Sequence, residues 1–576
     1  MSLSGLISTT TFKEQPAIVR RSGNYKPPLW DAHFIQSLQV IYTEESYGKR
    51  INELKEDVRR ILEKEAENPL VKLEQINDLS RLGISYHFED QIKAILNLTY
   101  NNNNNALWKK NNLYATALHF KLLRQYGFNP VSSEVFNAFK DEKKEFKESL
   151  SKDVKGMVCL YEASFYSFRG EPILDEARDF TTKHLKQYLM MTRQGKTISV
   201  DHDDNNDLMV KLVEHALELP VHWRMKRLEA RWFIDMYAEM SHHHHMNSTF
   251  LQLAKLDFNV VQSTYQEDLK HAVRWWKTTS LGERLPFARD RIVETFLWTV
   301  GVKFEPQFRY CRKMLTKMGQ LVTSMDDIFD VYGTLDELSL FQDALERWDI
   351  NTIDQLPDYM KIFFLAAYNV VNEMAYDVLK QNGILIIKYL KKTWTDLCKC
   401  YMLEANWYHS GYTPSLEEYI KNGWISIAEP LILVNLYCLI TNPIKEDDMD
   451  CLLQYPTFIR ISGIIARLVD DLGTSSDELK RGDNPKSIQC YMKENGICDE
   501  KNGREHIRNL ISETWKEMNE ARVGESPFSQ AFIETAIDFV RTAMMIYQKE
   551  QDGVGTNFDH YTKDGIISLF FTSIPI

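Results

Sequence analysis

Three carboxylates lie close together near the middle of the chain, on a segment that is otherwise apolar. In the stretch 321–332 they are Asp326, Asp327 and Asp330. On a helix, Asp326 and Asp330 lie one turn apart on one face, and Asp327 lies about 100° around the axis. Burying an unpaired carboxylate costs several kcal/mol, so such side chains need a cationic partner or a metal. Oxygen ligands with no Cys or His nearby favour a hard ion, Mg²⁺ or Mn²⁺.

A second group of oxygen ligands lies near residue 470. Asp470, Thr474 and Glu478 are spaced i, i+4, i+8, so on a helix they fall within about 80° of one another. Two carboxylates and a hydroxyl suit an octahedral Mg²⁺ that is completed by water and phosphate. Arg467 precedes Asp470 by one turn, and Lys486 follows the group. The two segments together predict a cage for several Mg²⁺ ions and a diphosphate.

Composition sets limits on the rest of the molecule. The chain has 576 residues, 44% of them hydrophobic, which is enough for two sizeable cores. A net charge of −12 argues against a nucleic-acid partner, which needs a basic face. The eight cysteines show no metal-ligand spacing and are expected to be free thiols. No run of 18 apolar residues occurs, so no transmembrane segment is expected.

Helical periodicity dominates from about residue 31 onward. Apolar residues follow helical spacing in 51–62, and the pattern recurs in 79–98, 115–125, 173–188 and 208–217. Alternating strand patterns of useful length are absent, which predicts an all-α protein. The stretch 201–204 spells Asp-His-Asp-Asp, an acid motif of protonation-initiated cyclases. We expect it to lie in a polar loop without function, because a general acid needs burial to raise its pKa.

Two further stretches bear on the site. The segment 287–298 predicts a helix on which Arg291 and Trp298, seven residues apart, share one stripe. Within 423–433, Pro430 removes the helical hydrogen-bond partner of the Ser426 carbonyl. A carbonyl freed in this way can steer a cation in the pocket, and a kink that serves packing alone explains the proline equally well.

The chain resembles a plant terpene synthase of the monoterpene-type subfamily along nearly its whole length. The resemblance rests on the first acidic box, Asp326 to Asp330, and on the second box, which begins at Asp470. It also rests on an Arg-Asp-Arg triplet upstream of the first box and on the pair Arg20-Arg21, which eight residues separate from Trp30. The implied fold is an N-terminal α-barrel domain followed by a C-terminal class I isoprenoid-synthase helical bundle.

Four segments are expected from this resemblance and from the composition. A flexible arm spans 1–30, the N-terminal barrel domain without chemistry of its own spans 31–241, a linker spans 242–247, and the catalytic metal-binding domain spans 248–576. The linker contains His242 to His245, where the composition shifts.

The resemblance implies roles for the acidic residues. Asp326 and Asp330 bind two of three Mg²⁺ ions, with Mn²⁺ as an alternative metal, and Asp327 supports these ligands from behind. The third ion is bound by Asp470, Thr474 and Glu478.

Cationic and aromatic residues complete the expected site. The diphosphate is bound by Arg289, Arg467 and Lys486 through their charge, and by Asp326, Asp330 and Asp470 through the metal ions. Arg291 closes over the departed group, and an arm that carries Arg20, Arg21 and Trp30 covers the pocket. Trp298, Tyr401 and Tyr547 are the expected aromatic stabilisers of a carbocation. Gly319, Val322 and Thr323 are expected at the pocket floor.

The expected reaction is ionisation of geranyl diphosphate and release of an acyclic or cyclic monoterpene, olefin or alcohol, together with diphosphate. The alternatives are a sesquiterpene synthase acting on farnesyl diphosphate, a chain-elongating prenyltransferase, and a non-catalytic helical binding protein. Thr474 argues against the prenyltransferase, which would carry aspartates at both ends of the second box. The product, the prenyl isomer and the final quenching step stay open.

The cellular setting is predicted less directly. Residues 2–19 are rich in hydroxyl side chains, as in a plastid transit peptide, which favours the plastid stroma. Their short length keeps the cytosol as the alternative. We expect a monomer or a weak homodimer with a prenyl diphosphate as its small-molecule partner.

Overall fold

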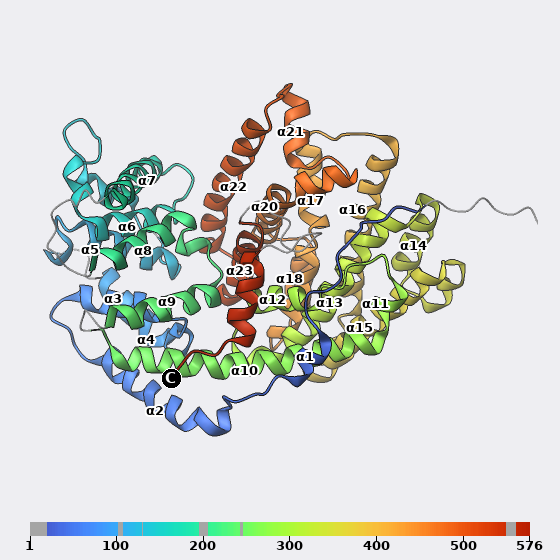
Figure 1. Ribbon diagram of the computed structural model, residues 1–576, viewed down its shortest axis with the longest axis horizontal. Coiled ribbons are helices and arrows are strands. Elements are labelled where there is room, and N and C mark those ends of the chain that lie inside the picture. Colours follow the sequence, from blue (N-terminus) through green and yellow to red (C-terminus); the bar gives the residue numbers. More distant parts are fainter. Residues whose placement is uncertain (1–19, 102–106, 130, 195–204, 242–245, 549–559) are drawn as a thin grey trace, which may run out of the picture.

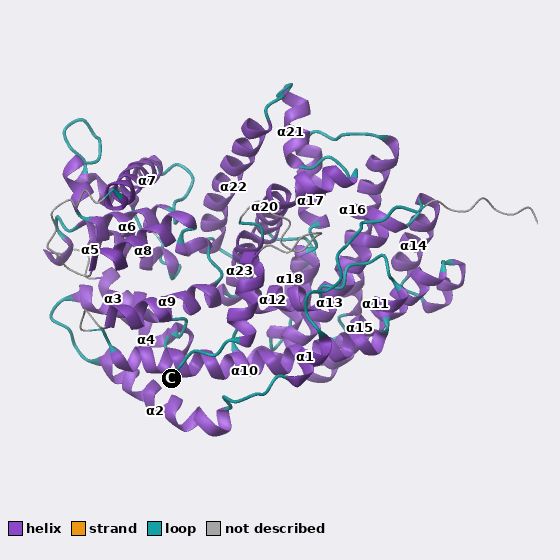
Figure 2. Ribbon diagram, in the orientation of Figure 1, coloured by secondary structure: helices purple, strands orange, loops and turns teal. Residues whose placement is uncertain are grey.

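The chain is helical throughout the part that the structure describes. The computed structural model describes residues 20–101, 107–129, 131–194, 205–241, 246–548 and 560–576. Within these ranges no strand occurs, and Lys140 and Phe146 form one isolated β-bridge (Figure 2). The all-α prediction is confirmed. The 201–204 motif and His242 to His245 lie outside the described residues.

The first half of the chain forms nine α-helices, which lie together on one side of the molecule except for α1 (Figure 1). Their bounds are α1 Ala32–Ser37, α2 Glu44–Glu63, α3 Pro69–Arg81, α4 Glu89–Asn101, α5 Leu113–Gln125, α6 Val154–Ser164, α7 Pro172–Arg193, α8 Asn205–Glu218 and α9 Lys226–Ser241.

The second half contains the helices that carry the acidic segments. Their bounds are α10 Ser248–Thr279, α11 Leu281–Arg284, α12 Ile292–Val302, α13 Arg309–Asp327, the π-helix η8 Ile328–Tyr332, α14 Leu335–Arg347, α15 Asp358–Asn382, α16 Ile387–Ser410, α17 Leu416–Ser426, α18 Glu429–Ile440, α19 Glu446–Leu452, α20 Thr457–Arg481, α21 Ser487–Asn495, α22 Glu500–Val523, α23 Gln530–Ile546, α24 His560–Ile566 and the π-helix η10 Ile567–Phe571.

The helix predicted over 79–98 is two helices. The chain leaves α3 at Arg81 and enters α4 at Glu89, and Gly83 lies between them with φ +73°. A side chain there would be strained, and a Cβ would come within 2.6 Å of Cβ of Ala230 on α9. The apolar periodicity continues across this turn, which is why the sequence pattern did not reveal the break. The other predicted helices, 51–62, 115–125, 173–188 and 208–217, lie within α2, α5, α7 and α8.

The long helix α10 connects the two halves of the molecule. It packs against α2 and α9 at one end and against α12 and α13 at the other, and Figure 1 shows it running beneath both halves. The C-terminal segment docks on it, because Gln262 Nε2 donates to the carbonyls of Ser568, Leu569 and Thr572. The end of the chain is therefore part of the core.

The N-terminal half ends with α9 at Ser241, and α10 begins at Ser248. Polar contacts cross between the halves. Asn519 on α22 donates to the carbonyls of Phe165 and Ser167, and its Oδ1 lies 2.8 Å from Nε2 of His222. These buried hydrogen bonds hold α22 against the N-terminal half.

One segment, Leu416–Ile440, is long and apolar enough in composition to cross a membrane, which the sequence analysis did not expect. It is α17 followed by α18, and Ala428 between them has φ +65°. Of its most apolar window 67% is buried inside the protein. The apolar side chains of this segment therefore serve the core of the helical bundle.

A fully buried ion pair fixes α13 on α10. Asp268 accepts hydrogen bonds from Arg312 Nη2 (2.9 Å) and Arg309 Nε (3.0 Å), and neither Asp268 nor Arg312 is exposed. We expect Asp268→Ala to lower the free energy of unfolding by about 3–5 kcal/mol, because it leaves the Arg312 charge buried and unpaired. Equilibrium urea unfolding measures the change.

The matched control is Glu267→Ala, which removes a neighbouring partner of Arg309 whose side chain is about half exposed. An exposed pair contributes at most about 1 kcal/mol. Equal losses of stability for the two variants would contradict the importance of the buried pair.

Candidate active site

A pocket of about 210 Å³ opens in the C-terminal half, between α12, α13, α16, α18, α20 and α23. Both acidic segments border it, together with the cations and aromatic residues expected at the site. The predicted residues that line it are Arg289, Arg291, Trp298, Gly319, Val322, Thr323, Asp326, Asp330, Tyr401, Arg467, Asp470, Thr474, Glu478, Lys486 and Tyr547.

The first acidic segment spans a change of helix type. Asp326 and Asp327 end α13, and Asp330 lies on the π-helix η8 that continues it. Asp326 and Asp330 both line the pocket, as predicted. Burial, with the negative charge of Asp326 next, raises the pKa of Asp330 well above its ordinary value. The first segment thus presents two close oxygen ligands.

Asp327 points away from the pocket and holds an arginine. Its side chain is fully buried, and its Oδ2 accepts hydrogen bonds from the backbone N–H (2.7 Å) and from Nε (3.2 Å) of Arg289. The same Nε lies 2.9 Å from Oδ1 in an ion pair. Arg289 also pairs with Asp326 through Nη2. The carboxylate of Asp327 therefore positions the guanidinium of Arg289 at the pocket wall.

The second segment repeats this arrangement on α20. Asp470 lines the pocket and pairs with Arg467, while the next residue, Asp471, is fully buried and forms an ion pair with Arg467, whose Nε lies 3.1 Å from Oδ1. Tyr419 and the backbone of Ser487 also donate to Asp471. In each segment the first aspartate faces the cavity and the second anchors an arginine. The sequence analysis gave Asp471 no role, although its position beside Asp470 matches that of Asp327 beside Asp326.

Several cations surround Glu478 at the end of α20. Lys486 Nζ lies 3.2 Å from its carboxylate, and Arg481 Nη2 lies 3.8 Å away. Burial alone would raise the pKa of Glu478, but the charges of Lys486, Arg467 and Arg481 lower it below its ordinary value. Arg481 lines the pocket and was missed, although it lies one helical turn after Glu478. Its positive charge adds to the anion-binding character of this wall.

The donor set fits a divalent metal ion. Oγ1 of Thr474 is buried at the pocket with no hydrogen-bond partner among the described residues, and Asp330 has no ion pair there. Carboxylate and hydroxyl oxygens are the ligands that hard divalent cations prefer. No three described His, Cys, Asp or Glu side chains cluster closely enough to hold a metal by themselves. The oxygens come from two opposite helices, so a complete shell needs further oxygens from water or substrate.

A further acid, Glu404 on α16, also lines the pocket and was not predicted from the sequence. It accepts a hydrogen bond from Asn422 Nδ2 (2.8 Å), and burial raises its pKa. It lies on an amphipathic helix with no flanking acidic motif, so no spacing signal singled it out.

Two local predictions were wrong. Arg291 does not share a helical stripe with Trp298, because α12 begins only at Ile292 and Arg291 is its N-cap residue. Its backbone N–H donates to Gln320 Oε1 (3.1 Å), and both Arg291 and Trp298 still line the pocket. Pro430 lies in the first turn of α18 and does not kink a continuous helix, since α17 ends at Ser426. The chain breaks there, and Ser426 borders the pocket.

Aromatic rings form the apolar end of the pocket. The ring of Trp298 lies 5.0 Å from that of Phe539 and 6.3 Å from that of Tyr547, between centroids. Tyr401 packs on Phe329 at 5.6 Å. Phe539 was not predicted. Such faces stabilise a cation without acting as nucleophiles.

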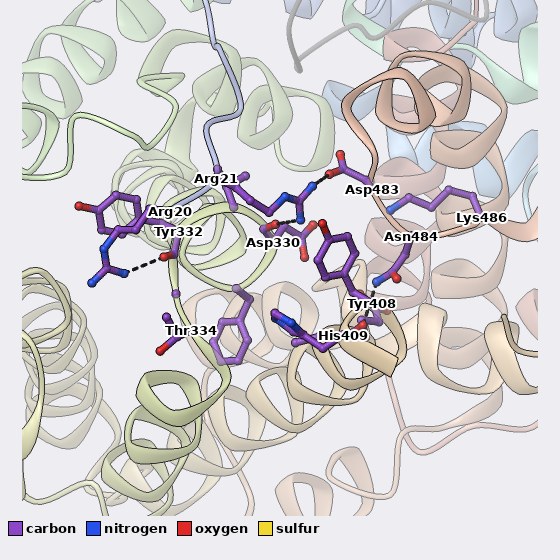
Figure 3. A pocket seen from close by; sticks show the side chains of 15 residues that line it. Arg20, Arg21, Asp330, Tyr332, Thr334, Tyr408, His409, Asp483, Asn484 and Lys486 are labelled. Carbon is purple, nitrogen blue, oxygen red and sulfur yellow. Dashed lines mark hydrogen bonds and ion pairs between the residues drawn. The ribbon is translucent and has the colours of Figure 1, made fainter. Parts of the chain in front are cut away.

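The N-terminal arm lines a smaller pocket of about 110 Å³, which shares Asp330, Glu404 and Lys486 with the larger one (Figure 3). Arg21 donates to the Asp330 carbonyl (2.7 Å) and pairs with Asp483 (2.5 Å), and its guanidinium covers the ring of Tyr408. Arg20 donates to the Tyr332 carbonyl and forms a bidentate pair with Glu337. The arm thereby joins the first acidic segment to the loop after α20.

Two aromatic residues extend the arm. The ring of Tyr25 lies 5.0 Å from the guanidinium of Arg289 and 5.7 Å from that of Arg481, so it covers cations of the pocket. Trp30, predicted as part of the lid, lies outside the pocket and donates to Glu294 Oε1 (3.0 Å). Trp30 anchors the arm at its base.

The fold and the site are those of a class I isoprenoid synthase, in which two helices with oxygen ligands face each other across an apolar pocket. A model described as the terpene synthase N-terminal domain matches residues 29–217, and one described as the terpene synthase metal-binding domain matches 277–517. The chain is 97% identical to a myrcene synthase of Cannabis sativa, over 100% of both chains. It is 62% identical to a probable chloroplastic monoterpene synthase of Humulus lupulus, over 100% of both. The chain belongs to the terpene synthase family.

Solved structures agree with this assignment. A limonene synthase with 2-fluorolinalyl diphosphate matches with a TM-score of 0.90 at 42% identity, covering 97% of this chain and 100% of that one. An isoprene synthase from grey poplar leaves, in complex with three Mg²⁺ ions and dimethylallyl-S-thiolodiphosphate, matches with a TM-score of 0.84 at 42% identity, covering 95% and 99%. The protein is a class I terpene synthase that uses a divalent metal cofactor.

Replacing Arg21 by alanine tests the contacts of the arm. The variant loses the bonds to the Asp330 carbonyl and to Asp483, so we expect the arm to open more often. Hydrogen–deuterium exchange of a peptide covering residues 22–30 should speed up at least tenfold, because the loss of even one charge-assisted hydrogen bond, about 1.5–3 kcal/mol, corresponds to a tenfold change or more. Arg50→Ala, which removes an exposed ion pair on α2, is the control. Unchanged exchange in Arg21→Ala would show that other contacts hold the arm.

Proposed function

We propose that this protein is a monoterpene synthase that ionises geranyl diphosphate and releases an olefin and diphosphate. The observation that carries the proposal is the pairing of two oxygen-ligand segments across one pocket whose inner end is aromatic. Such a pocket combines a polar end for diphosphate with an apolar end for a prenyl chain. The near-identical myrcene synthase supports myrcene as the main product.

Three Mg²⁺ ions are the proposed metals, and the isoprene synthase complex supports that number. We assign Asp326 and Asp330 to two of them, and the third is assigned to Asp470, Thr474 and Glu478. When bound, the metal ions neutralise the diphosphate and make it a better leaving group. Mn²⁺ is the alternative metal.

The cations of the chain bind the diphosphate oxygens in this proposal. Arg289 and Arg467 are held in place by Asp327 and Asp471, so their charges are oriented before the substrate arrives. Preorganised charges stabilise the developing negative charge as the allylic C–O bond breaks. Lys486 contributes a third charge, and Arg291 is assigned to closing the site over the departed group.

The allylic cation left behind needs a dry and non-nucleophilic environment. Trp298, Tyr401 and Tyr547 are assigned to this end, and each cation–π contact is worth on the order of 2 kcal/mol when desolvated. Arg20 and Arg21 hold the arm over the rim, which keeps water from capturing the cation. Loss of a proton from the cation to the released diphosphate ends the reaction as an acyclic olefin.

The remaining alternatives receive less support. One relative reported above is named a myrcene synthase and another a probable monoterpene synthase, and these names do not favour the farnesyl diphosphate alternative or a non-catalytic role. We propose the plastid as the location, which the chloroplastic name of the hop relative supports over the cytosol. The protein is proposed to act as a monomer or a weak homodimer.

A substrate panel tests the function. Incubation with geranyl, neryl and farnesyl diphosphate in the presence of Mg²⁺ should give a volatile monoterpene, mainly myrcene, from geranyl diphosphate by gas chromatography. Chelation of the metal should abolish product, because the diphosphate then lacks its neutralising charges. A dominant sesquiterpene from farnesyl diphosphate would contradict the proposal, and so would the absence of both volatile product and diphosphate release.

Variants of the two adjacent aspartates of the first segment are expected to differ in the activity that they retain. Asp326→Ala should lower kcat by about 100-fold or more, because it removes a metal ligand and the pocket-side partner of Arg289. Asp327→Asn should retain measurable turnover, since the amide oxygen can still accept from the backbone N–H of Arg289. Steady-state kinetics at saturating Mg²⁺ compares them. Equal and complete loss in both variants would contradict the division of roles.

A further inference from the structure

A second cavity, larger than the catalytic pocket, lies inside the N-terminal half. It measures about 460 Å³, against about 210 Å³ for the active site, and is enclosed by α3, α5, α6, α8, α9 and the start of α10. These helices, with the start of α10, lie together on the side of the molecule away from the acidic segments (Figure 1). A volume of this size is in the range of small-molecule sites, about 300–1,000 Å³.

The polar side chains that line this cavity are exposed at its mouth and buried at its floor. On α5, Tyr114, Leu118 and Lys121 follow helical spacing, and on α6 Lys155 and Glu162 lie two turns apart. At the mouth, Lys155 pairs with Glu74 (3.0 Å) and covers the ring of Tyr114 at 3.9 Å, and its side chain is more than half exposed. At the other end, Lys121 and Glu162 are only 7% and 4% exposed. The cavity therefore has a wet entrance and a buried polar floor.

The wall between these two ends is apolar. It consists of aliphatic, methionine and aromatic side chains from α5, α6, α8, α9 and α10, with Met246 just before α10: Leu118, Val158, Met209, Leu212, Phe233, Met240, Met246 and Phe250. An elongated apolar molecule that entered here would reach the floor with its far end.

The buried floor of the cavity carries a lysine that forms no ion pair with a described residue. Lys121 Nζ donates one hydrogen bond, to Asn77 Oδ1 (2.8 Å), and forms no ion pair with a described carboxylate. An ammonium has three donors, and burying it without a counter-charge is costly. By contrast, Arg81, another cation of the cavity lining, pairs with Glu229 at 2.7 Å. Two donors of Lys121 are thus available to an oxygen acceptor inside the cavity.

We propose that this cavity binds an apolar monocarboxylate of about ten to fifteen carbons, with its carboxylate on Lys121 and its chain along the apolar wall. The bound anion would supply the ion-pair partner that Lys121 lacks among the described residues, whereas the nearby Glu162 interacts with Lys121 only at longer range. Burial raises the pKa of Glu162 and of Asp78 to about 7, so near neutral pH these carboxyls can be protonated and donate to a carboxylate. The site is separate from the catalytic pocket and does not depend on the proposed reaction.

Equilibrium dialysis with geranic acid, geraniol and 2,6-dimethyloctane tests the site on the full-length protein. These probes share one branched skeleton and differ in the head group. We expect the acid to bind and the alcohol and the hydrocarbon to bind at least tenfold more weakly. Equal affinity for acid and alcohol would overturn the assigned head group, and absence of acid binding would overturn the site.

Paired lysine variants locate the binding. Lys121→Met should weaken binding of the acid at least tenfold, whereas Lys155→Met, which changes a lysine at the mouth, should stay within about threefold because that lysine is solvated and paired. Both variants should keep the wild-type rate with geranyl diphosphate. If neither variant lost acid binding, or if both lost it equally, the result would contradict the role of Lys121.

A photo-cross-linking measurement on the wild-type chain keeps the test valid if a variant fails to fold. A diazirine-bearing acid of the same length should label peptides from α5, α6 or α9. Labelling confined to α13 and α20 would place the probe in the catalytic pocket and overturn the inference.

Discussion

The catalytic half of this protein depends on burying two carboxylates that never face the pocket. Asp327 and Asp471 are fully enclosed, and each holds an arginine whose charge would otherwise be free to move. The cost of desolvating these ions is offset by close charge-assisted hydrogen bonds. Because the arginines are held from behind, the neighbouring Asp326 and Asp470 remain at the surface of the cavity. On both walls, therefore, one of two adjacent aspartates faces the cavity and the other anchors an arginine.

The helix arrangement explains why these pairs meet. α13 is fixed to α10 by Asp268 and Arg312, and α20 packs on α22 and α23 across the pocket. The arm then joins the rims, since Arg21 contacts both the Asp330 carbonyl and Asp483. Rigid elements therefore carry the ligands, and a long-range contact from the N-terminus covers them. This division suits a reaction in which charge must be placed accurately and water kept out.

Much of the site could be predicted from the sequence because its ligands follow helical spacing. Asp470, Thr474 and Glu478 all lie on α20 and line the pocket, as their spacing predicted. Glu404 and Tyr25 escaped because tertiary packing, not periodicity, brings Glu404 to the pocket and Tyr25 over its cations. Arg481 follows the helical spacing of α20, one turn after Glu478, and was overlooked. The break after Ser426 and the start of α12 at Ile292 were also missed, since apolar runs continue across both joins. The spacing of residues along the sequence identifies which side chains share a face of a helix. The ends of the helices and the contacts between distant segments depend instead on tertiary packing.

The docking of the C-terminal segment on α10 has a consequence for how the molecule is made. Gln262 bonds the carbonyls of Ser568, Leu569 and Thr572, and Asn259 exchanges two hydrogen bonds with the backbone of Ile574. The buried amides of α10 therefore depend on residues 568–574 for their partners. During translation the N-terminal barrel can fold first. The helix α10 gains these partners only once residues 568–574 have been synthesised, so a polypeptide that lacks them would leave the amides of Asn259 and Gln262 without these hydrogen bonds.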